Sequence, residues 1–547
     1  MKYIIYGNNR VAKDFIYIFN QLSVIKLTDN INCIIELRKV EDVQVIICDF
    51  DKAIKEKELQ ENGFVYGKDY LYEEDFFVQF DEISIPKDRN IAIWGVGNMC
   101  KFLLEHNLPW KADVFIDSYK SQETFNGVYI CSPTEITDWK KYYIIIAVAE
   151  DKEISKYLLE QGLAEDIDFL NYKKLLQLPS MLLRQTIFDP SYYDLECKTM
   201  QNHLEILPDG NTKSCCTTFV SQGLDNIFDK TSDEVWKSIL HKILCLSTEN
   251  RTFSFCDKNM CPLFVAKKLE DCRSISWEDK SYKQMSDFPE TLALSYDSSC
   301  NLACITCRKE LHFAKDKELE MVKKIEDKVI KEYLPYCKFL ILAGNGEVFA
   351  SPSYRKIYEA NQCNSKYIRL LSNGVLFTPA NWEHFKKNNN VKIMLTVSVD
   401  AASKETYQYI RRGNFDVLQQ NMRFASELRH KGELSYFRLN FVVQRENYKE
   451  MIDFVQWGKE LGVDEIFFTK ILNWGTYTPE EFEQISMMEK DGITPKSELK
   501  EILKHPVMQS DIVDLGTIQF GHKVDEIGIV ENYYMWELEK RGGKLFL

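Results

Sequence analysis

Three closely spaced cysteines are the residues of this 547-residue chain best placed to do chemistry: Cys300, Cys304 and Cys307. Thiolates on one short loop can bind three irons of a cubane cluster and leave the fourth iron open for a chelating ligand. Such a cluster can pass low-potential electrons to that ligand. Zinc normally takes four ligands and usually shows a second, matching pair of cysteines. The spacing therefore favours a [4Fe-4S] cluster over a zinc site or buried structural cysteines.

Glycine- and serine-containing motifs end three of the apolar segments that follow the cysteines. They are Gly344-Asn345-Gly346-Glu347, Ser372-Asn373-Gly374 and Ser398-Val399-Asp400. Together with the three cysteines after a strand, these motifs resemble the radical S-adenosylmethionine (SAM) superfamily from about Thr291 to Trp474. The resemblance implies an oxidoreductase that reductively cleaves SAM to a 5′-deoxyadenosyl radical, which abstracts hydrogen from a substrate. It also implies an electron donor such as flavodoxin or ferredoxin.

The resemblance further implies which residues contact SAM: Gly344, Gly346, Glu347, Ser398, Arg411 and Arg412. The glycine-rich motif would contact the SAM amino group, and Ser398 would lie near the ribose or the carboxylate. One of the two arginines would pair with the SAM carboxylate, a task suited to a planar guanidinium. Asp400 is either a cofactor contact or the N-cap of a helix over Ser403–Ile410. The Ser372-Asn373-Gly374 motif could be no more than a turn.

A second set of cysteines precedes this region: Cys197, Cys215, Cys256 and Cys261. A strand and tight turn over Leu204–Gly210 would bring Cys197 and Cys215 together as a hairpin. The spacing resembles the opening of a SPASM/twitch auxiliary-cluster domain, although that domain normally follows the barrel. The resemblance implies one auxiliary [4Fe-4S] cluster on these four thiolates. A structural zinc site in the same thiolates is the alternative, and Cys216 could replace Cys215 in either case.

Alternating strands and helices must position these motifs. Six apolar strands are expected in the second half of the chain: Leu292–Ser295, Phe339–Ala343, Ile368–Leu371, Ile393–Val399, Phe437–Val443 and Glu465–Thr469. With helical patterns between them, they predict an α/β architecture with a partial (β/α)6 barrel over residues 288–480. The cysteine-rich, SPASM/twitch-like domain over residues 190–275 precedes it. Residues 481–547 form a C-terminal extension without an assigned structure.

The first 178 residues contain a tandem repeat of one unit, over residues 1–85 and 86–178. Each copy opens with a short apolar strand that ends at a glycine, Gly7 or Gly95, and the second copy carries about 11 additional residues. Alternating strands and helices predict two tandem Rossmann-like units with parallel sheets. In the second copy, Gly95-Val96-Gly97 and Asp117 have the outline of a nucleotide-binding turn, with Asp117 placed to accept from a ribose hydroxyl. The third glycine is missing, so a docking or scaffold module is the alternative.

Composition excludes several classes of protein. The formal net charge of −14 argues against nucleic-acid binding, because such proteins gather Lys and Arg against phosphates. No apolar run approaches the roughly 20 residues that span a bilayer, and the short apolar N-terminus does not resemble a signal peptide. Sixteen cysteines without an export signal indicate reduced thiols used for metal or redox chemistry. The expectation is a cytoplasmic protein without nucleic-acid or membrane partners.

The substrate is the least determined feature. The duplicated Rossmann-like units favour a sugar or nucleotide-linked substrate, whereas the twitch-like segment favours a peptide or protein. A third alternative is a non-catalytic iron–sulfur scaffold or redox sensor, against which the intact Gly346-Glu347 and Ser398 positions count.

Overall fold

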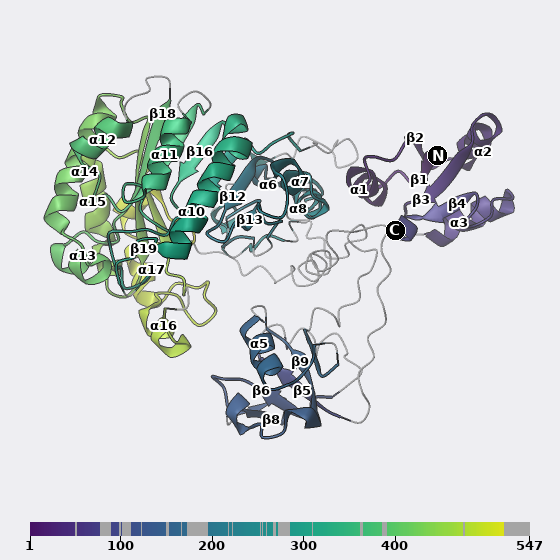
Figure 1. The fold of residues 1–547 in the computed structure, drawn as a ribbon, viewed down its shortest axis with the longest axis horizontal. Helices are drawn as coiled ribbons and strands as arrows, with labels where there is room; N and C mark the ends of the chain where they lie inside the picture. Colours follow the sequence, from purple (N-terminus) through teal and green to yellow (C-terminus); the bar gives the residue numbers. More distant parts are fainter. Residues whose placement is uncertain are drawn as a thin grey trace. The chain divides into compact units, whose positions relative to one another are not determined.

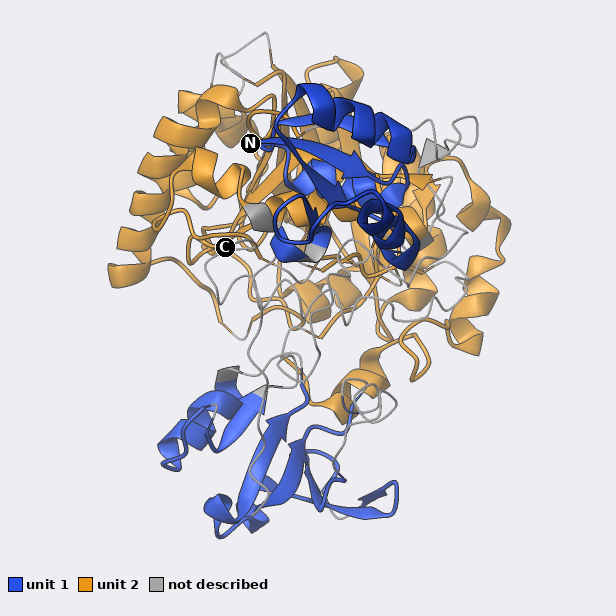
Figure 2. Cartoon of the chain, turned by 90° about the vertical axis from the view of Figure 1, so that its right-hand side faces the viewer, with its two compact units in different colours: residues 1–187, 527–547 blue, residues 188–526 orange. Residues whose placement is uncertain are grey.

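The computed structural model of the chain describes residues 1–518 apart from several gaps (Figure 1). The longer gaps are residues 77–88, 101–110, 172–194 and 272–284, and the others span five residues or fewer. Residues 519–547, which include much of the expected C-terminal extension, lie outside the described part. The chain divides into two compact units, residues 1–187 with 527–547 and residues 188–526 (Figure 2).

The first unit begins with a parallel sheet of four strands: β1 (Lys2–Tyr6), β2 (Val24–Thr28), β3 (Val43–Ile47) and β4 (Tyr70–Tyr72). Their order is β2-β1-β3-β4. The helices between them are α1 (Arg10–Ile18), α2 (Ile31–Val40) and α3 (Lys52–Glu61). One face of the sheet packs into an apolar core with Ile34 of α2 and Leu59 of α3, both fully buried.

A second sheet repeats this order with an insertion. Its strands are β5 (Asn90–Trp94), β6 (Val114–Ile116), β7 (Thr124–Phe125), β8 (Val128–Cys131), β9 (Tyr142–Ile146) and β10 (Phe169–Asn171), and α5 spans Lys152–Glu160. The sheet order is β10-β9-β5-β6-β8-β7, so β6-β5-β9-β10 matches β2-β1-β3-β4. The antiparallel pair β7–β8 stands where the first copy has helix α2. The additional residues of the second copy therefore lie between β6 and β9.

The second unit is built on a sheet of nine strands. They are β12 (His203–Ile206), β13 (Thr212–Lys213), β15 (Thr291–Leu294), β16 (Phe339–Leu342), β17 (Tyr367–Ser372), β18 (Lys392–Ser398), β19 (Tyr436–Val443), β20 (Glu465–Lys470) and β21 (Val513–Asp514). The order is β13-β12-β15-β16-β17-β18-β19-β20-β21, and only β13 runs antiparallel to its neighbour. The six predicted strands are confirmed and lie side by side in chain order.

The sheet extends beyond those six strands on both sides. On one side β12, from the cysteine-rich segment, pairs in parallel with β15, with Leu204 opposite Leu292. On the other side β21 pairs with β20. The cysteine-rich segment also contains β11 (Leu195–Glu196), β14 (Glu270–Asp271), α6 (Thr199–Asn202), α7 (Ser232–Trp236), α8 (Ile239–Glu249) and α9 (Pro262–Val265). The segment thus shares the sheet of the region that follows it.

Helices cover one face of this sheet (Figure 1). They include α10 (Asp316–Lys328), α11 (Pro352–Ala360), α12 (Pro379–Phe385), α13 (Lys404–Arg411), α14 (Phe415–His430) and α15 (Met451–Leu461), and the shorter α16 (Pro479–Ile485) and α17 (Ser497–Leu503) follow. Phe441 of β19 and Phe468 of β20 both contact Phe454 of α15, with ring centroids 4.8 and 6.2 Å apart. Because strand side chains alternate between faces, their sequence neighbours point to the opposite face, here called the inner face.

Among the described residues, no helix combines the length and the apolar character that crossing a membrane demands.

Candidate functional site

The cysteine loop follows β15, at the carboxyl edge of the nine-stranded sheet. Cys300 and Cys304 are buried, whereas Cys307 is exposed. Burial raises the pKa of the Cys304 thiol, and the neighbouring Asp400, Cys300 and Cys307 raise it further, against the opposing effect of Arg411. The three predicted cysteines therefore lie within electrostatic reach of one another. A loop with two enclosed thiols and one open to solvent fits a cluster that must also receive an electron and a ligand.

Arg308, directly after the third cysteine, fixes the shape of this loop. Its Nη1 donates to the Ser298 carbonyl at 2.7 Å, and its Nη2 donates to the Asn345 carbonyl at 2.6 Å. Its Nε lies 3.4 Å from Cys307 Sγ. Arg308 thus joins the cysteine loop to the glycine-rich loop and sets a positive charge beside a thiol. The sequence interpretation missed this residue, although its position next to Cys307 was a signal.

The glycines of the glycine-rich loop are required by close packing. A Cβ at Gly344 would lie 2.0 Å from Ser295 Oγ, and a Cβ at Gly346 would lie 2.4 Å from the Asp297 carbonyl oxygen. The amide of Glu347 donates to the Ser299 carbonyl at 2.8 Å. The two loops therefore touch through their backbones, which leaves no room for a side chain at either glycine.

Gly346→Ala is expected to lower the free energy of unfolding by about 1–3 kcal/mol, because the added methyl group collides with backbone rather than with a movable side chain. Urea denaturation measures the effect. Gly223→Ala is the matched control, since a Cβ there would lie 3.7 Å from the Thr212 carbonyl oxygen, an ordinary contact. Equal losses of stability in the two variants would contradict the packing argument.

Glu347 is fully buried and bridges two of the motifs. Its carboxylate accepts from Ser372 Oγ at 2.8 Å and from the amide of Asn373 at 2.6 Å. Burial raises the pKa of Glu347 to about 7, against the lowering effect of these hydrogen bonds. Asn373 Nδ2 in turn lies 3.8 Å from Cys300 Sγ. The Ser372-Asn373-Gly374 segment is therefore more than a turn, because it connects Glu347 to the cysteine loop.

Arg411 and Asp400 form a buried ion pair, with 2.9 Å between Nη1 and Oδ2. Asp400 also accepts from the amide of Val442 at 2.7 Å. The N-cap of α13 is Ser403, whose side chain accepts from the amide of Thr406. The alternative in which Asp400 caps this helix is thus wrong, because Asp400 lies three residues too early and turns its carboxylate towards Arg411.

The two candidate arginines lie in different surroundings. The carbonyl of Arg411 is 3.7 Å from Cys304 Sγ, and its Nε is buried without a hydrogen-bond partner among the described residues. Arg412 is exposed at the end of α13 in a left-handed conformation. Ser398 ends β18 and pairs with Asn440 of β19 at the same carboxyl edge. The structure therefore brings Arg411 to the cysteine loop and Arg412 to the surface.

The second set of cysteines comes together around the predicted hairpin. Strands β12 and β13 pair antiparallel, with Ile206 opposite Thr212. Burial raises the pKa of Cys215 well above its usual value, and the nearby Cys256, Cys261 and Cys197 raise it further. Cys197 and Cys256 also pack against Phe253. Cys216 is exposed, with its sulfur 3.0 Å from Thr218 Oγ1.

Among the described residues, no three His, Cys, Asp or Glu side chains are gathered closely enough to hold one metal ion. A cubane of four irons and four sulfides is larger than an ion, so its thiolates stand further apart. Both cysteine sets bring several thiols to one place, and this donor type suits iron–sulfur clusters as well as zinc.

Gly95 and Asp117, which suggested a nucleotide site in the first unit, have structural roles. A Cβ at Gly95 would lie 2.4 Å from the side chain of Val148, so the glycine serves the packing of the sheet. The Asp117 carboxylate accepts from the amides of Val96, Tyr119 and Lys120, at 3.3, 2.9 and 3.1 Å. Residues 98–99 and 101–110, where the expected helix would begin, lie outside the described part of the chain.

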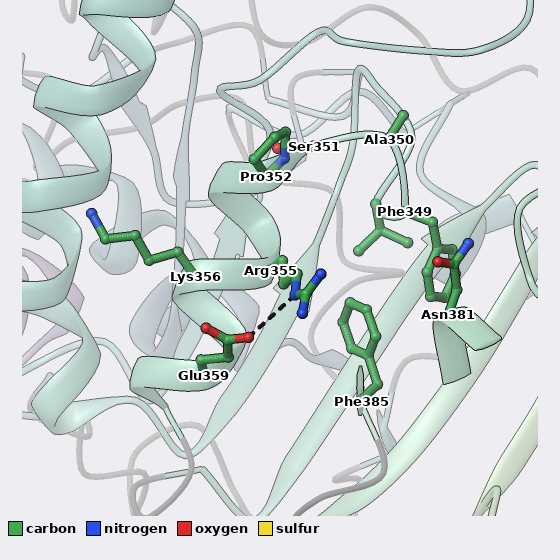
Figure 3. A pocket seen from close by; sticks show the side chains of 10 residues that line it. Phe349, Ala350, Ser351, Pro352, Arg355, Lys356, Glu359, Asn381 and Phe385 are labelled. Carbon is green, nitrogen blue, oxygen red and sulfur yellow. Dashed lines mark hydrogen bonds and ion pairs between the residues drawn. The ribbon is translucent and has the colours of Figure 1, made fainter. Parts of the chain in front are cut away.

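A cavity of about 420 Å³ lies beside the glycine-rich loop, between that loop and helices α11 and α12 (Figure 3). Its aromatic side is formed by Phe349 and Phe385, with ring centroids 5.0 Å apart. Its charged side holds Arg355, whose Nε donates to Glu359 at 3.2 Å (Figure 3). Arg355 and Glu359 are thus engaged with each other, Lys356 pairs with Glu326, and none of the predicted site residues lines this cavity.

Comparison with known proteins identifies the region around the cysteines. Residues 297–458 match the family model described as the Radical SAM superfamily. No curated protein matches the chain. Among solved structures, Streptococcus suis SuiB bound to precursor peptide SuiA is 16% identical with a TM-score of 0.25, covering 34% of this chain and 40% of SuiB.

Two further structures are similar to a comparable part of the chain. AnSMEcpe with bound AdoMet and Kp18Cys peptide is 21% identical with a TM-score of 0.26, covering 34% of this chain and 51% of that protein. TYW1 with a lysine-pyruvate adduct is 19% identical with a TM-score of 0.26, covering 37% of this chain and 69% of TYW1. The chain thus spans about half or less of SuiB and anSMEcpe, and the similarity is partial in every case.

The matched residues 297–458 contain the cysteine loop, the glycine-rich loop, Ser398 and Arg411. This segment therefore matches the Radical SAM superfamily, and the match supports an iron–sulfur enzyme whose cofactors are a [4Fe-4S] cluster and SAM.

Proposed function

We propose that Cys300, Cys304 and Cys307 bind the [4Fe-4S] cluster and that the enzyme cleaves SAM reductively to abstract hydrogen from its substrate. The observation that carries this proposal is the joining of the cysteine loop to the glycine-rich loop by Arg308. When bound, the cluster supplies one electron to SAM, which splits into methionine and the 5′-deoxyadenosyl radical. A partial (β/α)6 barrel over residues 288–480 is the proposed frame, and a flavodoxin or ferredoxin the proposed electron donor.

The protein's own residues hold SAM in this proposal. Gly344, Gly346 and Glu347 receive the amino group, which gains a buried carboxylate as partner. Arg411 receives the carboxylate, because its buried Nε lacks an acceptor among the described residues and a guanidinium fork fits a carboxylate. Ser398 contacts the ribose. Arg412, at the surface, takes no part.

We further propose that Cys197, Cys215, Cys256 and Cys261 bind one auxiliary [4Fe-4S] cluster. The mutual proximity of the four thiols supports it. Such a cluster can accept an electron from the substrate radical or bind the substrate. A structural zinc site remains the second candidate for this set, and Cys216, whose sulfur lies 3.0 Å from Thr218 Oγ1, is the alternative to Cys215 in either case.

We propose a peptide or protein substrate ahead of a sugar or nucleotide-linked one. The duplicated Rossmann-like units favoured a nucleotide, and Asp117 was the residue expected to accept from its ribose. The Asp117 carboxylate instead accepts from the amides of Tyr119 and Lys120 in its own loop and from the amide of Val96 after β5. Peptides are bound in the SuiB and anSMEcpe structures named above. The sugar or nucleotide-linked substrate is the second candidate.

The test is anaerobic reconstitution with iron and sulfide, followed by reduction, addition of SAM and quantification of 5′-deoxyadenosine. We expect about eight irons per chain, four for each cluster, and product that disappears when the iron is removed by a chelator. A variant with serine at Cys197, Cys215, Cys256 and Cys261 should retain about four irons.

The possible outcomes separate the candidates. Zinc instead of iron at the second set would leave the wild type with about four irons and reject the auxiliary cluster. A fully loaded protein that neither binds nor cleaves SAM would reject catalysis and favour a scaffold or redox sensor.

A further inference from the structure

We propose that an oxyanion of the substrate, a carboxylate or a phosphate, binds to Arg369 and Arg438 on the inner face of the nine-stranded sheet. This inference rests on the proposed function, because it names the chemical group by which that enzyme holds its substrate. A guanidinium presents paired N–H donors that fit either oxyanion.

Both arginines point to the same side of the sheet. Arg369 lies on β17 between Ile368 and Leu370, which are buried on the helix-covered side. Arg438 lies on β19 three residues before Phe441, whose ring packs on α15, so Arg438 belongs to the inner face. Strand β18 runs between them, with Met394 opposite Arg369 and Thr396 opposite Arg438.

The two side chains form a cluster with an excess of positive charge. Burial lowers the pKa of Arg369, and the nearby charge of Arg438 lowers it further. The carboxylate that the structure places beside them is Glu465, 3.8 Å from Arg438 Nη1, and it also accepts from the hydroxyl of Tyr436. Among these described residues, two guanidinium groups thus face one carboxylate, so an anionic ligand would balance the charge.

Donors in this cluster lack acceptors. Arg369 Nε is buried without a hydrogen-bond partner among the described residues, and its guanidinium lies over the ring of Phe339 at 5.4 Å. Thr396 Oγ1, on a side chain only 4% exposed, is unpartnered within the same part of the chain. Buried polar groups normally have hydrogen-bond partners, so Arg369 Nε and Thr396 Oγ1 are expected to bind a ligand or a water molecule. An oxyanion would accept from both.

Arg438, by contrast, is already held in place. Its Nε donates to Asn440 Oδ1 at 2.8 Å, and its guanidinium lies over the ring of Phe467 at 4.0 Å. Arg438 is thus a fixed cation, and beside it Arg369 has an N–H donor without an acceptor among the described residues. This is the arrangement of a preformed anion site.

The cluster lies at a useful distance from the proposed SAM site. Asn440 pairs with Ser398 at the carboxyl edge, and Arg438 precedes Asn440 by two residues, about 7 Å along a strand. An anion held at the arginines would leave the rest of a substrate extending towards Ser398 and the cysteine loop. The arginines would then anchor one end of the substrate while hydrogen is removed from the other.

The experiment uses the reconstituted, SAM-saturated enzyme and calorimetric titration with three probes at constant ionic strength: inorganic phosphate, pyrophosphate and glutarate. We expect at least one probe to bind and its Kd to rise about tenfold or more in Arg369→Gln, through loss of a charge-assisted hydrogen bond. Arg369→Lys keeps the positive charge but loses the paired N–H donors of the guanidinium, so its Kd should lie between those of the wild type and Arg369→Gln. Preference for the phosphates or for glutarate identifies the source of the oxyanion.

Arg423→Gln is the matched control, because Arg423 is an exposed arginine of α14 on the other side of the sheet. A second readout is the melting temperature of the ligand-free protein, which should stay equal or rise in Arg369→Gln because an unsatisfied buried cation is removed. Absence of binding by all three probes, equal Kd values in Arg369→Gln and wild type, or a marked fall in melting temperature would each overturn the inference.

Formation of 5′-deoxyadenosine in the same samples separates this inference from the proposed function. If wild type and Arg369→Gln both cleave SAM but no probe binds, only the anion site is rejected. If the wild type cleaves no SAM, the proposed function itself fails. A weaker SAM affinity in Arg369→Gln without any probe binding would assign the arginine to SAM and also overturn the anion site.

Discussion

Replacing Cys300, Cys304 and Cys307 together by alanine is expected to abolish formation of 5′-deoxyadenosine, with product falling to the level of a sample without enzyme. The loss should be complete because electron delivery to SAM depends on the cluster, and no other side chain can provide it. Liquid chromatography of anaerobic reactions measures the product. Iron content should fall by about four per chain while the second cysteine set keeps its own iron.

Cys337→Ala is the control for this variant. Cys337 is a buried cysteine just before β16, hydrogen-bonded through its sulfur to Ser365 at 3.5 Å and outside both cysteine sets. Its replacement should reduce stability slightly and leave SAM cleavage in place. Undiminished product from the triple variant would show that these cysteines do not hold the catalytic cluster.

Arg411→Gln is expected to lower the free energy of unfolding by about 3–5 kcal/mol, the usual cost of leaving one partner of a buried ion pair alone. The carboxylate of Asp400 would remain buried and would keep its hydrogen bond from the Val442 amide. SAM affinity should fall as well, since the variant also removes the proposed partner of the SAM carboxylate. Denaturant titration and equilibrium binding of SAM measure the two effects separately.

The double variant Arg411→Gln with Asp400→Asn distinguishes the two roles of this arginine. Removing both charges should recover much of the lost stability, because two neutral amides can hydrogen-bond where the charges paired. SAM affinity should stay low in the double variant. Recovery of both properties together would mean that Arg411 serves Asp400 alone, and the assignment of the carboxylate contact would then be wrong.

Local patterns were sufficient to predict the six central strands and the motifs between them. Buried side chains occupy alternate positions of short apolar segments, as Leu340, Leu370 and Phe441 do in β16, β17 and β19. This period of two predicts a strand whatever the strand pairs with. The order of the sheet followed because each strand is joined to the next by a helix, which makes neighbouring strands parallel. The positions of the cysteine and glycine-rich loops after their strands followed in turn.

Long-range pairing was not visible in the sequence. Strands β13 and β21 are two residues long, which is too short for a recognisable strand pattern. Strand β12 pairs with β15 across a segment of more than eighty residues, and no local pattern in the sequence indicates that pairing. The choice between Arg411 and Arg412 also depended on tertiary packing, because neighbouring residues on a helix point in different directions. In the sequence, Arg369 and Arg438 are ordinary strand residues far apart in the chain, and only the strand register of the sheet brings them to the same face.

The pairing of β12 with β15 has a consequence for dissecting this protein. A shortened chain that begins near residue 288 would lack β12 and β13, and β15 would become an edge strand with its hydrogen-bonding groups exposed. Exposed edges of this kind pair with other copies and promote aggregation. The radical SAM domain and the cysteine-rich segment should therefore be expressed as one piece, since the latter covers an edge that the former cannot protect alone.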